Sequence, residues 1–297
     1  MAGSLLCDVN GDGTYSDESG EHGTTLDNVR LLGINSSYWG QNGYSQFGEL
    51  HGFSAGISWD ATIGVMAHEL GHAYFDLPDL YDTTNASAGI GAFGLMGSGP
   101  WGYKSITEKN GSTPVHLSAW SKEKLGVCNP QTVSSGADNY TLPAVYKMID
   151  NSSSCGIYKA STSTSGEYFL FENRSAGGYD EGLNYLIKDN SSSQYVGTNY
   201  TGGLAVWHVY DNLSKCKASN SCMALNPPLV DLEEANNADL DNVSFKGRTT
   251  HLFFIGNSVT FDNSSTPNSN LYDNTSSGIS LTNISAAGDN MTLTISK

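Results

Sequence analysis

The spacing of apolar residues predicts a helix over residues 60–75 (DATIGVMAHELGHAYF). Asp60 is placed to cap its N-terminus, and Pro78 cannot continue it, so we expect the helix to end near Phe75. Apolar positions at i, i+3 and i+4 form one face, which we expect to be buried. This face comprises Ile63, Met66, Ala67, Leu70 and Tyr74.

A second helix is predicted over residues 114–126, because apolar residues again recur at helical spacing and Gly126 stops the run. Further along the chain the apolar period changes from helical spacing to two, with Asn, Ser and Gly turns between the runs. We therefore predict two domains, residues 1–128 and residues 129–297, the second an antiparallel β-rich domain. Its clearest predicted strands are residues 167–174, 202–211, 250–256, 278–285 and 291–296.

The first predicted helix contains the motif HELGH, which is a candidate zinc site. His68 and His72 are spaced i, i+4, so both imidazoles lie on one face of the helix about one turn apart. Glu69 lies beside them but off that face, where it can take a proton from a metal-activated water instead of ligating. The motif also occurs by chance in helices, with its polar side chains on a solvated face.

A catalytic zinc site usually has three protein ligands, so the residues after the helix are candidates for the third. Asp76, Asp79 and Asp82 follow within one short stretch. Asp76 is where the chain must turn, and Asp tolerates the left-handed conformation of such a turn. We favour Asp79 as the ligand, because it can return beneath the histidines. Asp82 either binds Ca²⁺ or fixes the turn by local hydrogen bonds.

Several long segments resemble the immune inhibitor A (M6) family of secreted zinc metallopeptidases. The resemblance covers nearly the whole chain from about Asp8 and is far more specific than HExxH alone. The matching boxes are residues 68–82, 89–102, 113–126, 167–183, 202–212, 230–241 and 266–285.

This resemblance implies a zincin-like catalytic domain, extracellular proteolysis, catalytic Zn²⁺ and structural Ca²⁺. The fold class expected is α+β, with the β-rich domain following the zincin-like domain. Family members usually carry a propeptide and more catalytic sequence upstream, so we expect a shortened N-terminal side here, with signal and propeptide outside this chain. Met96 resembles the methionine turn beneath the zinc of metzincin-like peptidases, or is a plain core methionine.

Other polar residues are weaker candidates for the site. His116 either ligates or stabilises an oxyanion, or is a hydrogen-bonded structural histidine on the second helix, which we favour. Tyr81 and Tyr103 can donate hydrogen bonds to a reaction intermediate, but the chain has 16 tyrosines. His208 alternates with apolar residues of a predicted strand and is expected to be a satisfied core residue.

Two acidic segments are candidate Ca²⁺ sites. Residues 8–19 (DVNGDGTYSDES) resemble the start of an EF-hand loop, with Asp8, Asn10 and Asp12 at its ligand positions, but lack the closing Glu. We interpret them as a Ca²⁺-binding turn, with a bare glycine turn as the alternative. Residues 230–241 (VDLEEANNADLD) form either a second Ca²⁺ site or a solvated loop, and the loop is slightly favoured.

Five cysteines are present, and the spacing favours Cys216–Cys222 as a disulfide, followed by Cys128–Cys155, with Cys7 left over. The alternative is five reduced thiols. The formal net charge of −16 argues against nucleic-acid binding, since no basic patch can neutralise phosphates. No apolar run reaches the ~18 residues that a membrane span needs. We expect a monomer that acts on protein or peptide substrates outside the cell.

These observations favour a zinc endopeptidase with Glu69 as general base. Two alternatives stay open: a catalytically incomplete, Ca²⁺-dependent binding module derived from a peptidase, and a zinc hydrolase acting on something other than protein. Neither a G-x-S-x-G elbow nor a phosphate-binding P-loop occurs, so serine-nucleophile and phosphoryl-transfer chemistry have no support.

Overall fold

The computed structural model describes residues 50–54, 57–148, 155–189, 194–219, 221–236, 239–242 and 245–297. The predicted Ca²⁺ residues Asp8, Asn10 and Asp12, together with Cys7, lie outside the described residues. The fold is mixed α+β. Within the described ranges, no helix is long and apolar enough to cross a membrane.

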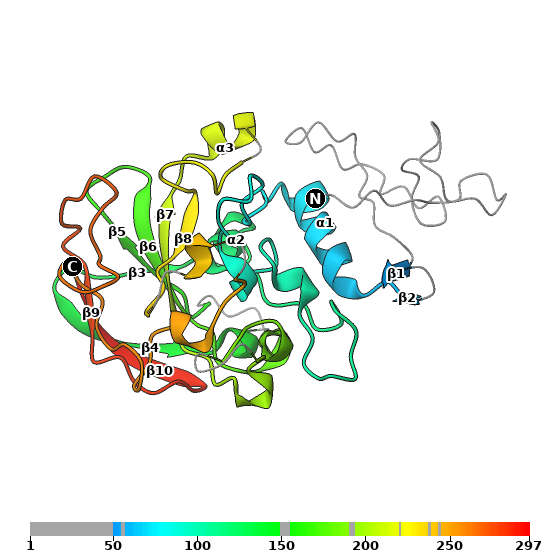
Figure 1. Ribbon diagram of the computed structural model, residues 1–297. Helices are drawn as coiled ribbons and strands as arrows, with labels where there is room; N and C mark the ends of the chain where they lie inside the picture. Colours follow the sequence, from blue (N-terminus) through cyan, green and yellow to red (C-terminus); the bar gives the residue numbers. More distant parts are fainter. Residues whose placement is uncertain are drawn as a thin grey trace.

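The strands β3 to β10 lie at one end of the molecule and α1 lies at the other, beside β1 and β2, with α2 between (Figure 1). The helices are α1 (Ile63–Phe75), α2 (Ala119–Lys124) and α3 (Leu213–Ser219), with short 3-10 turns between elements. The strands are β1 (Leu50–Ser54), β2 (Ile57–Asp60), β3 (Gln131–Thr132), β4 (Ala137–Pro143), β5 (Tyr158–Ser161), β6 (Glu167–Asn173), β7 (Leu204–Tyr210), β8 (Val230–Leu232), β9 (Ser280–Thr282) and β10 (Asn290–Ser296).

The helix α1 ends at Phe75 as predicted, but its start and its buried face differ from the prediction. Asp60 ends β2, and Thr62 is the N-cap residue. The predicted apolar face is partly exposed, with Ile63 at 48% and Tyr74 at 62%. The buried positions are instead Gly64, His68, Gly71 and Ala73.

Glycine explains this reversal, because a helix can approach its neighbours most closely where side chains are missing. A Cβ atom added at Gly64 would lie 1.9 Å from the carbonyl oxygen of Pro100, and one at Gly71 would lie 2.6 Å from Met96 Sδ. The face that carries the histidines is therefore the face that packs against the following loops.

The second predicted helix forms only in its last half, as α2 capped by Ser118. The residues before it are extended because their backbone groups pair with another loop. The Val115 N–H donates to the Gly99 carbonyl (3.0 Å), and the His116 carbonyl accepts from the Leu95 N–H (3.1 Å). His116 therefore precedes the helix, and the prediction that it lies on the helix is wrong.

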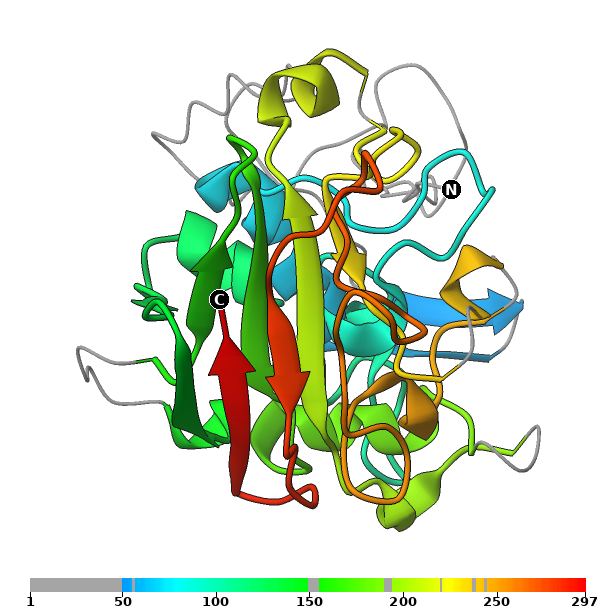
Figure 2. The same ribbon diagram turned by 90° about the vertical axis from the view of Figure 1, so that its left-hand side faces the viewer.

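Three sheets are present among the described residues. A five-stranded sheet has the order β3-β5-β6-β7-β8, and a three-stranded sheet has the order β4-β10-β9. All their pairs are antiparallel except β3–β5. The strands β9 and β10 lie in front of the larger sheet in Figure 2. A separate hairpin pairs β1 with β2.

Four of the five predicted strands are confirmed as β6, β7, β9 and β10. The prediction of a strand over residues 250–256 is wrong, since this segment makes a 3-10 turn and then pairs through the single bridge Leu204–Phe253. The strands β3, β4, β5 and β8 were not predicted, because they are short or contain few apolar residues.

The central strands β6 and β7 are buried on both faces. On β6, Tyr168 and Leu170 belong to a hydrophobic cluster that also contains Trp120 of α2 and Met96. Phe169 lies on the opposite face of β6. It belongs to a second cluster, which also contains residues from the same face of β7 and residues of β4, β9 and β10. The first cluster contains residues from both sides of the predicted boundary at residue 128, which itself stays a prediction.

Both favoured cysteine pairs are disulfides in the structure. Cys128 is bonded to Cys155 with a Cα–Cα distance of 5.4 Å, and Cys216 to Cys222 with 4.4 Å. The first disulfide joins the segment after α2 to the segment before β5. Both distances are in the usual Cα–Cα range for disulfides, and the second is at its lower limit.

Candidate metal centre

His68, His72 and Asp79 converge from α1 and the loop that follows it. The Nε2 atoms of His68 and His72 lie 3.1 Å apart. Asp79 Oδ1 lies 3.2 Å from the first and 3.0 Å from the second. Within the part of the chain that the structure describes, these residues form the one group of three His, Cys, Asp or Glu side chains close enough to hold a metal ion.

The turn at Asp76 brings Asp79 back to the histidines. Asp76 has φ 58° and ψ 28°, the left-handed conformation expected at the end of a helix. Its N–H donates to the His72 carbonyl (3.1 Å), and the Leu77 N–H donates to the Gly71 carbonyl (3.1 Å). These two bonds satisfy the end of the helix and reverse the chain.

Backbone carbonyls orient both imidazole rings. His68 Nδ1 lies 2.9 Å from the Leu95 carbonyl oxygen, and His72 Nδ1 lies 2.6 Å from that of Leu77. A carbonyl can only accept, so each neutral ring carries its proton on Nδ1 and presents an Nε2 lone pair to the cluster. Metal-ligating histidines usually have such a second partner.

This donor set fits Zn²⁺. With the Nδ1 atoms protonated, two nitrogen lone pairs and the Asp79 carboxylate face one another, and Asp79 Oδ1 is buried without a hydrogen-bond donor. In tetrahedral zinc sites, ligand atoms about 2.0–2.2 Å from the metal lie about 3.3–3.6 Å from one another. The distances of 3.0–3.2 Å found here are a few tenths of an ångström shorter, so a small outward movement of the three side chains brings them to that spacing.

The electrostatics of the cluster follow from burial and from its own charges. Burial would raise the pKa of Asp79, but the two histidines outweigh it and the pKa is lowered. Burial would lower the pKa of His72, but the Asp79 carboxylate outweighs it and raises the pKa. The pKa of Glu69 is raised by burial, which the neighbouring histidines oppose. Glu69 is therefore held beside the cluster as a stronger base than an exposed glutamate.

Tyr81 and Met96 lie next to the cluster. The ring of Tyr81 stacks on that of His68 with centroids 6.3 Å apart. Burial, followed by the Asp79 carboxylate, raises the pKa of Tyr81, so its phenol stays protonated. Met96 is buried beneath the helix, next to Gly71. Tyr103 lies elsewhere, where its ring stacks on that of Tyr185 with centroids 5.5 Å apart.

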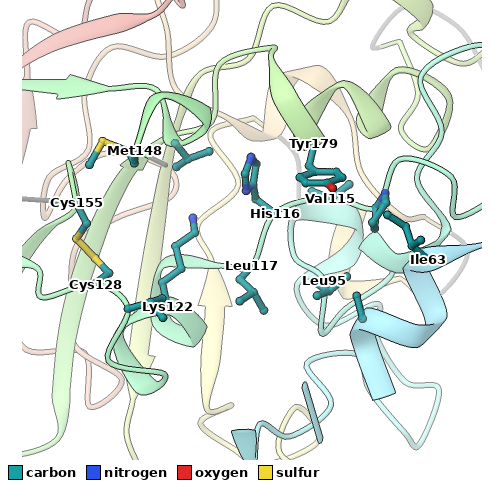
Figure 3. A pocket seen from close by; sticks show the side chains of 14 residues that line it. Ile63, Leu95, Val115, His116, Leu117, Lys122, Cys128, Met148, Cys155 and Tyr179 are labelled. Carbon is teal, nitrogen blue, oxygen red and sulfur yellow. A yellow bond between two sulfur atoms is a disulfide. The ribbon is translucent and has the colours of Figure 1, made fainter. Parts of the chain in front are cut away.

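His116 lines a separate pocket of about 550 Å³ (Figure 3). Its Nε2 is buried with no hydrogen-bond partner, and burial lowers its pKa to about 4. None of the three clustered residues lines this pocket, although Leu95 and Ala67 do. The structure therefore places His116 outside the metal centre.

Asp82 shows the local hydrogen bonds that were one of its two expected roles. Oδ1 accepts from the Thr84 N–H (2.8 Å) and hydroxyl (2.7 Å), and Oδ2 accepts from the N–H groups of Ala86 (3.1 Å) and Ser87 (2.9 Å). These donors hold the loop between Asp79 and the Met96 segment. In the other acidic segment, Glu233 lies beside His208, with Oε1 3.1 Å from its Nδ1.

His208 is a satisfied core histidine, as predicted. Its Nε2 lies 2.9 Å from Glu167 Oε1 and its Nδ1 lies 3.1 Å from Glu233 Oε1. The ring is stacked between Phe169 and Tyr272, with centroids 4.2 Å and 4.1 Å away. Burial lowers its pKa to about 4.

Comparison with known families agrees with this geometry. Residues 41–128 match the family described as immune inhibitor A peptidase M6, catalytic domain. The M6 resemblance is confirmed. No curated protein matches the chain. The matched segment contains HELGH, Asp79, Met96 and His116, and its similarity to a peptidase catalytic domain suggests a metallopeptidase.

The sequence did not reveal the carbonyls of Leu77 and Leu95, which orient the rings of His72 and His68. Backbone groups have no side-chain signature, so only the folded chain identifies them. Gly71, within HELGH, did carry a signal, because a glycine inside a helix often marks a close approach of another segment.

Proposed function

We propose that this chain is a secreted zinc endopeptidase, in which His68, His72 and Asp79 hold the metal. The observation that carries the proposal is the convergence of His68 Nε2, His72 Nε2 and Asp79 Oδ1 at 3.0–3.2 Å from one another. Like partial charges at such distances repel one another, and a cation between them removes the repulsion.

A zinc ion bound there supplies a water of lowered pKa and a Lewis acid that polarises the scissile carbonyl. Glu69 accepts the proton of the attacking water and later delivers it to the leaving amine nitrogen. Its position beside the ligands, with a raised pKa, suits both transfers. Tyr81, protonated and next to Asp79, is our candidate donor to the developing oxyanion.

The remaining assignments are extensions of this proposal. Two disulfides are typical of proteins that fold in an oxidising compartment, which supports an extracellular location. We assign residues 1–128 to a zincin-like catalytic domain and residues 129–297 to a β-rich domain. Structural Ca²⁺ at residues 8–12, and monomeric action on protein substrates, also belong to the proposal.

The decisive experiment compares casein hydrolysis by the wild-type chain and by Glu69→Gln, with stoichiometric Zn²⁺ and added Ca²⁺. Glutamine keeps the shape of Glu69 but cannot take up a proton, so we expect activity to fall by about 10²–10⁴. Zinc content, measured by elemental analysis, should not change. The matched control is Glu181→Gln, which alters only an exposed ion pair with Lys104 and should keep full activity.

Two results would contradict the proposal. Equal hydrolysis by wild type and Glu69→Gln would show that the proteolysis comes from another group or a contaminant. A wild-type chain that binds zinc but cleaves no protein would favour a binding module or a hydrolase with another substrate.

A further inference from the structure

We propose that Arg174, which follows strand β6, is a positioning residue for the zinc ligand His68. This inference rests on the proposed zinc site and adds that the sheet outside the matched M6 segment sets the orientation of one ligand. It is carried by a chain of hydrogen bonds that runs from Arg174 to the His68 ring.

Arg174 is fully buried and every side-chain nitrogen has a partner. Its Nε and Nη2 donate to the two oxygens of Asp180, each at 2.7 Å. Its Nη1 donates to the Phe93 carbonyl and to Glu172 Oε1. This fork requires a planar guanidinium, which a lysine ammonium cannot replace.

Two connections lead from this guanidinium to Leu95. Directly, Nη1 holds the Phe93 carbonyl, two residues before Leu95. Indirectly, Asp180 Oδ1 accepts from the His116 N–H (3.3 Å), and the His116 carbonyl accepts from the Leu95 N–H (3.1 Å). Both connections fix the backbone on the N-terminal side of Leu95.

The Leu95 carbonyl is the group that orients His68. It lies 2.9 Å from His68 Nδ1 and therefore holds the proton on that nitrogen, leaving Nε2 free to ligate. A shift or rotation of this carbonyl would release the proton to Nε2 in a fraction of the molecules. Arg174 thus acts on metal binding through the Leu95 carbonyl, without contact with the metal.

The test uses the full chain with Arg174→Lys, which keeps the positive charge but removes the fork. We expect its zinc affinity, measured by competition with a chelating dye, to fall by about 10–100-fold, as for other changes of a ligand's outer partner. In the metal-free protein, ¹⁵N NMR of the histidine rings should show the His68 proton moving partly from Nδ1 to Nε2, with the signal assigned by His68→Gln. Circular dichroism and thermal unfolding identify the folded fraction.

A second variant and a matched control make the result decisive. Asp180→Asn keeps the size of the side chain and one acceptor oxygen. We expect smaller changes of zinc affinity and of the His68 tautomer in the same direction. If Arg174→Lys does not fold, this variant tests the inference in its place. The control is Glu167→Gln, another buried charged residue of β6, which pairs with His208 and has no connection to Leu95. We expect it to lower the melting temperature and to leave zinc affinity and the His68 tautomer unchanged.

Folded Arg174→Lys with wild-type zinc affinity and an unchanged His68 signal would overturn the inference. Equal weakening in Glu167→Gln would also overturn it, because the effect would then be general loosening of the sheet. Neither readout requires proteolysis, so a wild-type chain that binds zinc without cleaving protein would contradict the proposed function alone. If the wild type bound no zinc, the inference would be overturned together with the proposed zinc site.

Discussion

The centre at His68 and the cluster around His208 both combine histidine with carboxylates, but the hydrogen-bond partners of their ring nitrogens differ. At His68 and His72, each Nδ1 donates to a backbone carbonyl, so the Nε2 atoms and Asp79 are left facing one another as acceptors. At His208, both ring nitrogens face carboxylates, from Glu167 and Glu233. Because the Asp79 carboxylate raises the pKa of His72, a proton and a metal ion compete for the first arrangement, whereas both ring nitrogens of His208 already face carboxylates.

The pKa values of the second cluster agree with that description. Burial lowers the pKa of His208 to about 4, and burial with the Asp241 charge raises that of Glu233 to about 8. At neutral pH a protonated Glu233 can donate to Nδ1, while the Nε2 proton goes to Glu167, which also accepts from the Tyr272 N–H (2.8 Å). The partner of Nδ1 thus decides whether a histidine is free to bind a metal.

The largest expected effect comes from replacing one histidine in each of the two clusters. His72→Ala should abolish stoichiometric zinc binding, a greater loss than the roughly 10–100-fold of outer-shell changes. In metal-free solution it should lower stability less than the His208 change described next, because it removes one bond to the Leu77 carbonyl and the attraction of Asp79. His208→Gln should do the reverse: zinc binding is kept, and unfolding free energy falls by about 3–5 kcal/mol as buried carboxylates lose their partner. Isothermal titration measures zinc binding, and urea unfolding measures stability. Equal behaviour of the two variants in both measurements would contradict the distinction between the clusters.

A smaller effect concerns the pH dependence of stability. Because the folded pKa of Glu233 is raised to about 8 from 4.5, its contribution to stability is fully present below pH 4.5 and is lost as the pH rises through 8. The lowered pKa of His208 acts oppositely, but only between about pH 4 and 6.5. We therefore expect metal-free wild type to lose on the order of 1 kcal/mol between pH 6.5 and 8. Glu233→Gln should lose less, as measured by urea unfolding at both pH values; an unchanged loss would exclude Glu233 as its source.

An effect of similar size tests the role of the turn that joins α1 to Asp79. Asp76→Val places a β-branched residue at φ 58° and should cost about 1–2 kcal/mol in thermal or urea unfolding. Asp76→Asn tolerates this conformation and serves as the control. Zinc affinity should fall in the valine variant alone; if both variants matched wild type, the left-handed turn would not be what positions Asp79.

Local features of the sequence predicted those parts of the molecule that depend on neighbouring residues. The helix end at Phe75, the shared face of His68 and His72, four strands and both disulfides follow from spacing and turn chemistry. The prediction of Asp79 as third ligand also rested on a local turn, and the structure brings Asp79 to the histidines. The helix end and the turn require only contacts within a few residues, and the strands are indicated by their own period-two pattern, although their partners lie far along the chain, as in β4 and β10.

Long-range contacts decided the rest. The buried face of α1 was mispredicted because glycine packing against Pro100 and Met96 outweighs the apolar stripe. The second helix lost its first half to backbone pairing with residues 95–99, which no periodicity reveals.

By itself, the sequence determined that His68, His72 and Asp79, the proposed metal ligands, come together, since a helix and one turn bring them there. Only the tertiary structure decided how they are oriented, because the Leu95 carbonyl and the buried Arg174 that supports it come from segments distant in sequence. Hydrogen bonds between such segments depend on backbone positions that form only when the chain is folded.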